Sequence, residues 1–182
     1  MAVRHKTPFT PNKIYFLTFT AFRWYNIFVN DKYCDLIYKW FDYTKDNYGN
    51  KIHGYVIMPN HIHILMYISD RSPRPSVLIQ NAKRFLAYQI INYLKEDDNI
   101  ELLNNLKTGP NKNKAKHQVF QPRYDSLMIY NTKIFLQKLD YIHHNPCQPK
   151  WNLADKPEDY RYSSAADYLA DGGYYGVDVI DL

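Results

Sequence analysis

The spacing of hydrophobic residues along the chain predicts both strands and helices. Runs rich in β-branched and aromatic residues predict strands at 51–58, 61–68 and 118–129, and at 13–28 either one long strand or a strand that enters a loop. Apolar positions three and four residues apart predict helices at about 31–47, 75–94 and 131–144. In chain order these elements describe an α+β fold: a ferredoxin-like antiparallel sheet with helices on one face, plus an added C-terminal helix.

The ends of these elements carry their own signals. Pro122 inside the last strand predicts an edge position, because proline cannot donate a hydrogen bond to a neighbouring strand. Asn131 is a good N-cap for the last helix, and Pro146 ends that helix. The segment 96–116 is polar and contains Gly109, so it predicts an exposed, mobile loop.

The length of 182 residues falls within the usual range of one domain, so we expect a single domain over 1–182. This domain would include the loop at 96–116 and a C-terminal extension at 147–182, where Ser163 or Ser164 caps a short helix. No stretch approaches the roughly 20 apolar residues of a membrane-spanning helix, and the N-terminal residues lack the apolar segment of a signal peptide. We therefore expect a cytoplasmic protein with no membrane partner.

The composition indicates nucleic acid as a partner. There are 23 Lys and Arg against 18 Asp and Glu, a formal charge of +5 and a pI of about 9.0, together with 18 tyrosines. Positive charge attracts phosphates and aromatic rings stack on unpaired bases, so the combination favours single-stranded nucleic acid over a membrane surface. A basic protein that is simply rich in tyrosine is the alternative. Cys34 and Cys147 are too few and too far apart for a disulfide framework or a paired-cysteine zinc site.

Two histidines in the strand 61–68 are candidate metal ligands. His61 and His63 are two residues apart, so both imidazoles project from one face of the strand while Ile62 and Ile64 project from the other. Such a pair binds a divalent ion if a third ligand comes from elsewhere in the fold. The alternative is a half-exposed strand whose polar face happens to carry histidines.

The helix 131–144 ends with a second candidate pair. Tyr141 and Asn145 are four residues apart and therefore share one side of the helix, away from the expected buried stripe. The Asn145 carbonyl oxygen is a hard ligand that would complete a site for Mg²⁺ or Mn²⁺ with two imidazoles. The alternatives are a C-cap role for Asn145 and a partly buried structural ring for Tyr141. The buried stripe itself would consist of Phe135, Leu139 and Ile142.

These motifs resemble those of a known family. The segment YVIMPNHIHIL resembles the His-hydrophobe-His motif of the HUH single-strand endonucleases and single-tyrosine transposases. LDYIHHNP resembles the catalytic-tyrosine helix of the REP-associated tyrosine transposases, and it follows the histidines in the order that this family has. VFQPRYDSLMIYN and PEDYRYSSAADY also resemble family segments, so the resemblance covers most of the chain.

The resemblance implies a role for each of these residues. It implies that His61, His63 and Asn145 bind a divalent metal, Mg²⁺ or Mn²⁺, and that Tyr141 on a catalytic C-terminal helix is the nucleophile. The implied activity is metal-dependent cleavage and transfer of single-stranded DNA at hairpins or palindromes, through a 5′-phosphotyrosine intermediate. The implied enzyme works as a monomer or a homodimer.

The chain departs from the family pattern in two places. Ser126 and Leu127 stand where the family commonly has Glu-His after the aromatic residue of the pre-helix segment, so any DNA-contacting role of that histidine is absent. The lysine-rich loop at 111–116 is longer than usual, which leaves the preferred target open. Candidate contacts to the DNA backbone, each alternatively a solvated surface charge, are Lys83, Arg84, Arg123, Lys112 and Lys114.

Two other functions are compatible with the same sequence. One is a domesticated relative that binds hairpin DNA without cutting it, although the intact Tyr141 disfavours this. The other is a ferredoxin-like RNA-binding module, disfavoured by the lack of an aromatic ribonucleoprotein motif. Tyr124 and Tyr130, which precede the last helix, are alternative candidates for the nucleophile.

Overall fold

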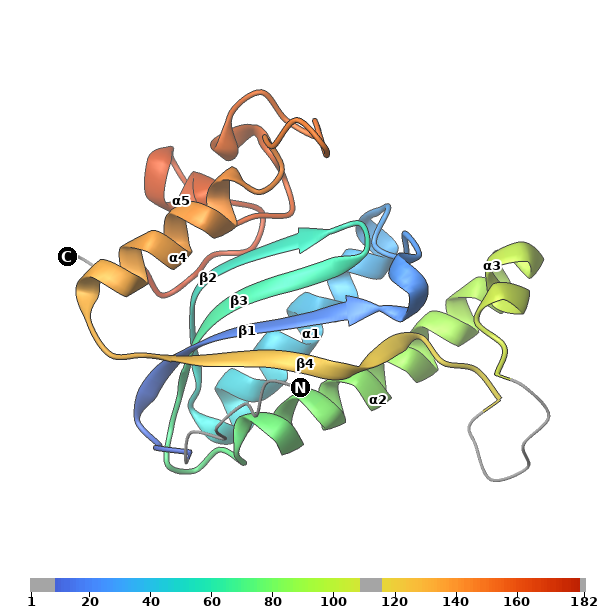
Figure 1. The fold of residues 1–182 in the computed structure, drawn as a ribbon, viewed down its shortest axis with the longest axis horizontal. Coiled ribbons are helices and arrows are strands. Elements are labelled where there is room, and N and C mark those ends of the chain that lie inside the picture. The colour runs from blue at the N-terminus through green and yellow to red at the C-terminus, as the bar shows by residue number, and fades with distance from the viewer. Residues whose placement is uncertain (1–8, 109–115, 181–182) are drawn as a thin grey trace, which may run out of the picture.

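A computed structural model describes residues 9–108 and 116–180 of the chain. Its strands and helices follow the predicted order (Figure 1). In chain order they are β1 (Lys13–Ala21), η1 (Phe22–Trp24), α1 (Asp31–Tyr48), β2 (Lys51–Met58), β3 (His61–Ile68), α2 (Pro75–Glu96), α3 (Ile100–Asn105), β4 (Phe120–Ile129), α4 (Thr132–His144), η2 (Pro157–Asp159) and α5 (Ala165–Leu169). None of the helices within these described ranges is long and apolar enough to span a membrane.

The sheet has the strand order β2-β3-β1-β4, and every neighbouring pair is antiparallel. This is the ferredoxin-like order, with β4 at one edge as the proline in that strand predicts. The predicted fold class is therefore confirmed. The central position of β3 matters for the site, because this strand carries His61 and His63.

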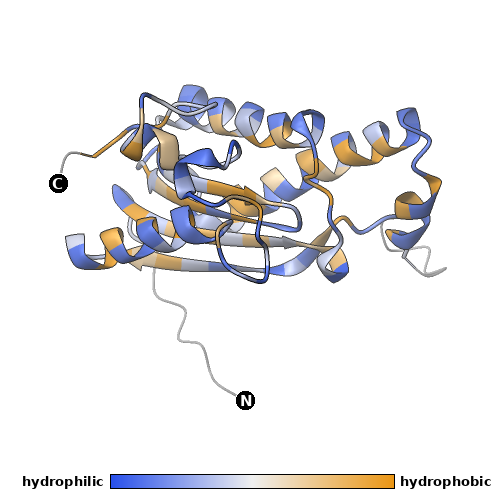
Figure 2. Cartoon of the chain, turned by 90° about the horizontal axis from the view of Figure 1, so that it is seen from above, coloured by the Kyte–Doolittle hydropathy of each residue, from blue (hydrophilic) through white to orange (hydrophobic). Residues whose placement is uncertain are grey.

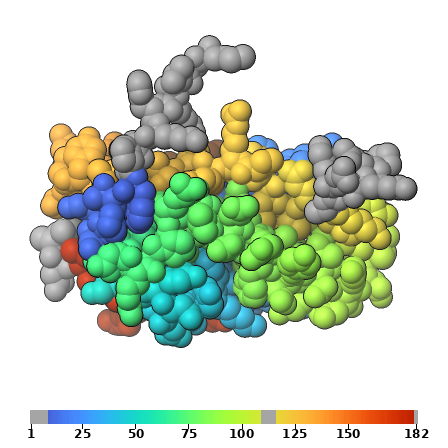
Figure 3. Space-filling model, turned by 90° about the horizontal axis from the view of Figure 1, so that it is seen from below, coloured from blue at the N-terminus to red at the C-terminus, as the bar shows by residue number. Residues whose placement is uncertain are grey.

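Helices cover both faces of the sheet. α1 and α2 pack on one face and bury the larger apolar cluster, whereas α4 lies across β2 and β3 on the other face (Figure 1). Figure 3 looks at the first of these faces, where α1 and α2 form most of the surface. Along the helices, hydrophilic and hydrophobic positions alternate, as expected for elements with one buried side (Figure 2).

Side-chain caps fix where α1 and α4 begin. The Asn30 side chain accepts a hydrogen bond from Tyr33 N, and α1 ends at Gly49, which adopts the left-handed conformation with φ of 68°. The Asn131 side chain accepts from Ile134 N at 2.8 Å, which confirms the predicted N-cap of α4. The start of α4 determines where the catalytic candidates fall on the helix.

Of the two interpretations of residues 13–28, the structure has the strand that enters a loop. It ends at Ala21 rather than Phe28, because the chain turns at η1 and residues 27 and 28 donate backbone hydrogen bonds to the Pro59 carbonyl instead of pairing along the sheet. Arg23 and Trp24 in this turn have φ of 51° and 60°. The aromatic run at 13–28 therefore includes a turn.

The segment 96–116 is not the continuous exposed loop that its polarity predicts. It contains α3, whose first turn is capped by Asn99, and Leu106 after this helix is fully buried. Leu102 and Leu103 pack against the main core. These three leucines bury apolar surface and so favour the packing of residues 100–106 against the domain.

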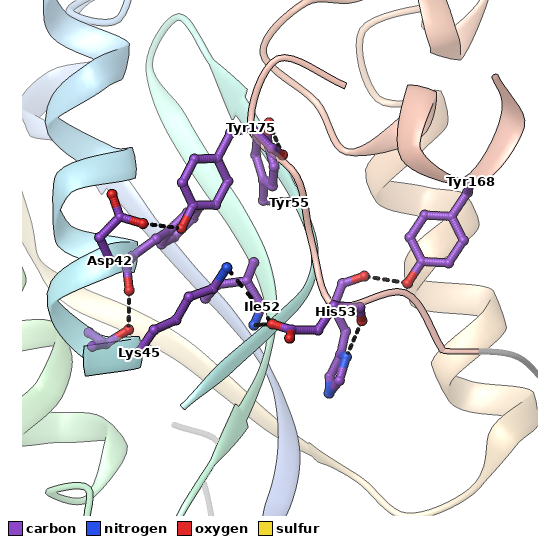
Figure 4. A network of polar contacts seen from close by, with 10 residues as sticks. Asp42, Lys45, Ile52, His53, Tyr55, Tyr168 and Tyr175 are labelled. Atoms are coloured by element: carbon purple, nitrogen blue, oxygen red, sulfur yellow. Dashed lines mark hydrogen bonds and ion pairs between the residues drawn. The ribbon is translucent and has the colours of Figure 1, made fainter. Parts of the chain in front are cut away.

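The C-terminal extension runs along the outer edge of β2. Tyr162 O accepts from Ile57 N, and further along the same edge Asp178 N donates to Ile52 O. Figure 4 shows the second of these regions, where the Asp178 carbonyl also pairs with His53 Nδ1 at 2.7 Å. The extension thus satisfies backbone groups that an exposed edge strand would leave open.

The short helix α5 follows Ser164, and of the two serines predicted to cap it, Ser163 is the one whose hydroxyl bonds at its start. Ser163 Oγ accepts from Ala165 N, whereas the Ser164 hydroxyl is used elsewhere. It accepts from Tyr55 N at 2.9 Å and lies 3.0 Å from His143 Nε2. Ser164 therefore ties the extension to both β2 and α4.

Candidate active site

His61 and His63 project from the face of β3 that lies under α4. Both are 6% exposed, and their ring centroids are 4.8 Å apart. Ile62 and Ile64 project from the opposite face into the core beneath α1 and α2. The alternation of the strand thus places the two imidazoles side by side in the α4 layer.

The Nδ1 atom of each histidine already has a partner. His61 Nδ1 lies 2.7 Å from Asn60 Oδ1, and His63 Nδ1 lies 2.7 Å from Thr18 Oγ1 on the neighbouring strand. A carboxamide oxygen can only accept, so His61 carries its proton on Nδ1 and keeps a lone pair on Nε2. Partners of this kind orient histidines that bind metals.

Burial keeps both imidazoles neutral. It lowers the pKa of His61 to about 4, assisted by the charge of Lys150. It lowers the pKa of His63 to about 3, with further contributions from His61, Lys138 and Lys150. Neutral imidazole is the form that binds a metal ion, so the pair is in the ligand form at pH 7 without any proton release.

Tyr141 reaches this pair from α4. Its hydroxyl oxygen lies 3.5 Å from His63 Nε2, and the two rings meet edge to face with centroids 5.2 Å apart. The residue is 40% exposed, so a substrate has access to the phenol. The Lys138 ammonium lies 5.8 Å from the centroid of the same ring. A nucleophile candidate, a cation and a metal-ligand candidate therefore meet in one place.

Asn145 follows the last turn of α4 and is 1% exposed. Its carboxamide oxygen is buried and has no hydrogen-bond partner among the described residues. A buried acceptor without a partner is costly, and a bound cation would satisfy it. Asn145 occupies the C-cap position, but its backbone alone makes the cap contact, to Ile142 O.

The donor atoms present are compatible with a divalent ion. Two neutral imidazoles and one carboxamide oxygen form a ligand set without charge, which leaves the full positive charge of the ion for a phosphate. Within residues 9–108 and 116–180 there is no group of three or more His, Cys, Asp or Glu side chains that could hold a metal. A third protein ligand from these residues would therefore be of another type, and Asn145 is the residue that the sequence predicts for this role.

The predicted DNA-contacting residues lie elsewhere. Lys83 and Arg84 are on α2, on the opposite side of the sheet from the histidines (Figures 1 and 3). The Lys83 ammonium donates to the backbone carbonyls of Gln121 and Arg123, both at 2.8 Å, and burial lowers its pKa to about 8. Arg84 lines a groove of about 400 Å³ between α1 and α2.

The remaining candidates are spread over the molecule. Arg123 is exposed on the edge strand β4, and Lys112 and Lys114 fall outside the described residues. Of the alternative nucleophiles, Tyr124 packs against the core on the α2 side, with its ring near Lys83. Tyr130 is 69% exposed just after β4.

Comparison with known proteins bears on the fold. No protein-family model matches the chain, and no curated protein matches it in sequence. A solved structure of a REP-associated tyrosine transposase bound to a REP hairpin matches with a TM-score of 0.61 and 19% identity, over 100% of this chain and 95% of that chain. The chain has the fold of this transposase. A candidate transposase from Deinococcus radiodurans gives a TM-score of 0.41 and 15% identity, over 77% of this chain and 95% of that chain.

The transposase fold that the sequence motifs imply is thus present over the whole chain. Several residues around the histidines were not predicted from the sequence, among them Asn60, Lys150 and the four that follow. Lys138 precedes Tyr141 by three residues, a helical spacing that could have revealed it. Three others carry no local signal, because they reach the site only through tertiary packing: Thr18, Trp24 and Trp151.

Proposed function

We propose that this protein is a metal-dependent endonuclease and strand transferase that acts on single-stranded DNA, at hairpins or palindromes, through a 5′-phosphotyrosine intermediate. The observation that carries the proposal is the position of Tyr141, exposed and 3.5 Å from Nε2 of a buried, neutral histidine. The fold shared with a REP-associated tyrosine transposase supports it, since that protein is described in complex with a REP hairpin.

The proposed metal ligands have a role separate from that of the nucleophile. His61 and His63 would hold a divalent ion, Mg²⁺ or Mn²⁺, through Nε2, and Asn145 would contribute its carboxamide oxygen. When bound, the ion offsets the negative charge that develops on the phosphate. Asn60 and Thr18 orient the two imidazoles through Nδ1.

Tyr141 would then cleave by in-line attack. Its phenol oxygen forms a bond to phosphorus, the bond from phosphorus to the 3′ oxygen breaks, and the phenol proton passes through solvent to the departing 3′ oxygen. The strand keeps its 5′ phosphate on Tyr141, and a second 3′ hydroxyl can reverse the step to join strands. Lys138, above the Tyr141 ring, adds positive charge where the phosphate would lie.

Formation of the covalent adduct tests the proposal. The protein is incubated with a single-stranded hairpin oligonucleotide and Mn²⁺, and products are separated on a denaturing gel. We expect a protein-DNA band that disappears with Tyr141→Phe or EDTA and persists with Tyr130→Phe, a matched change at a more exposed tyrosine.

Other outcomes separate the alternatives. A mobility shift insensitive to EDTA, without any covalent band, would identify a non-cleaving hairpin-binding protein. Tight RNA binding unchanged by His61→Ala would identify an RNA-binding module. An adduct that survives Tyr141→Phe but not Tyr130→Phe would assign the nucleophile to Tyr130.

A further inference from the structure

Trp24 is an exposed tryptophan at the edge of the candidate site. It is 57% exposed, and its ring meets His61 edge to face with centroids 5.9 Å apart. Trp151 approaches the same imidazole, with centroids 5.6 Å apart. His61 is therefore flanked by two indoles, one of which leaves much of its surface open to solvent.

The backbone holds the Trp24 ring in this position. Arg23 and Trp24 both adopt left-handed backbone conformations, which large side chains rarely do outside functional sites. The Asn60 carboxamide donates to Trp24 O at 3.3 Å, and the Asn60 carbonyl accepts from Ala21 N at 2.8 Å. Because Asn60 also bonds to His61 Nδ1, one residue anchors the backbone at Trp24 and orients the neighbouring imidazole.

Positive charge surrounds this aromatic surface. Arg23 is exposed next to Trp24, and the Lys150 ammonium lies 5.6 Å from the Trp151 ring centroid. Lys138 and Lys150 both contribute positive potential at His63. An open aromatic face among cations is what a single-stranded nucleic acid recognises, with a base on the ring and phosphates on the charges.

We propose that Trp24 is a base-stacking residue, and that its indole stacks on a nucleobase of the strand whose phosphate lies at His61 and His63. This inference rests on the proposed function and adds a specific contact to it. Every base offers a flat face, so stacking on Trp24 would set the affinity and position of the strand with little regard to its sequence.

A comparison of two single strands tests this contact. Binding is measured by fluorescence anisotropy in EDTA, with a short labelled oligothymidylate and with an abasic strand of the same length and charge. We expect Trp24→Ala to raise the Kd for oligothymidylate about tenfold and to leave the Kd for the abasic strand unchanged. Tyr88→Ala, which removes an exposed ring from α2, should change neither Kd.

Each other outcome overturns the inference. An unchanged Kd for oligothymidylate, or an equal loss on both strands, would show that Trp24 stacks on no base. If Trp24→Ala does not fold, Trp24→Phe is used instead. Oligothymidylate should then quench the tryptophan emission of the original protein well beyond that of the Trp24→Phe variant. Equal quenching in the two proteins contradicts the inference.

The test also separates the two proposals. If the unaltered protein binds neither strand and forms no adduct with a hairpin, the proposed function and the role of Trp24 fail together. If it forms the Tyr141 adduct while Trp24→Ala binds oligothymidylate normally, only the role of Trp24 fails.

Discussion

The two faces of the sheet differ in what they bury. Toward α1 and α2 the strands present apolar side chains such as Leu17, Phe19 and Ile64, all 1% exposed or less. Toward α4 the same strands present Phe16 and Leu65 together with buried imidazoles and the Thr18 hydroxyl. The first face is organised for stability, whereas the second tolerates polar groups that a purely structural layer would avoid.

The distribution of buried histidines makes the contrast plain. Among residues 9–108 and 116–180, every buried histidine contacts the α4 layer or belongs to it. The buried histidines are His53, His61, His63 and His143. Each of them has a polar partner, which offsets part of the cost of burial. A layer that keeps such groups is where chemistry is expected.

The largest effect on stability should come from the apolar face. Phe41 on α1 is fully buried in the main core, so Phe41→Ala should lower the free energy of unfolding by about 3–5 kcal/mol. Urea denaturation measures this loss. Leu136→Ala, at an exposed position on α4, should cost less than about 0.5 kcal/mol. Similar losses for both variants would contradict the assignment of Phe41 to the main core.

The α4 face should dominate metal binding. His61→Ala should weaken Mn²⁺ binding at least about a hundredfold, because it removes one of the proposed ligands. Isothermal titration calorimetry at pH 7 provides the affinity. His144→Ala is the matched control, since His144 is exposed on α4 and pairs with Asp140. Equal affinity in the two variants would rule out the histidine pair as the metal site.

Acid should lower the stability of the fold through the buried histidines on the α4 face. The folded-state pKa values of His61 and His63, about 4 and about 3, lie below the unfolded value near 6.5. In acid the unfolded chain therefore binds more protons than the folded chain. The contribution of these two histidines to the free energy of unfolding is fully present above about pH 6.5 and is lost as the pH falls toward 4. We expect a loss on the order of 2 kcal/mol for each of His61 and His63 by about pH 5.

Urea denaturation of the metal-free protein at several pH values checks this expectation. His63→Gln should reduce the slope of stability against pH, because it removes one of the titrating groups. A slope unchanged by His63→Gln would contradict the assignment of the acid effect to this pair.

The smallest effect concerns Lys138, whose charge we propose to lie near the bound DNA. Lys138→Gln should weaken binding of a single-stranded oligonucleotide severalfold and reduce the slope of log Kd against log salt concentration by about 0.7. Arg84→Gln, on α2 across the sheet, should leave both quantities unchanged. The reverse result would indicate that DNA binds on the α1 and α2 face, where the sequence predicts contacts at Lys83 and Arg84.

Much of the site follows from local periodicity. The alternation of a strand is enough to place His61 and His63 on one face, and helical spacing is enough to align Tyr141 with Asn145. Periodicity fails where contacts are not local. The free ammonium expected for Lys83 is instead bonded to β4 carbonyls, and the indole of Trp24 turns toward His61 only because η1 is bonded to residues far along the chain.

The sequence by itself determined the order of the elements, the ferredoxin-like class and the faces on which the candidate ligands lie, because these depend on repeats within each segment. Only the tertiary structure decided that α4 crosses β3 closely enough for Tyr141 to meet His63, and that Thr18 and Trp24 complete the surroundings. These contacts join residues distant in the chain, and they arise from the packing of whole layers rather than from any local pattern.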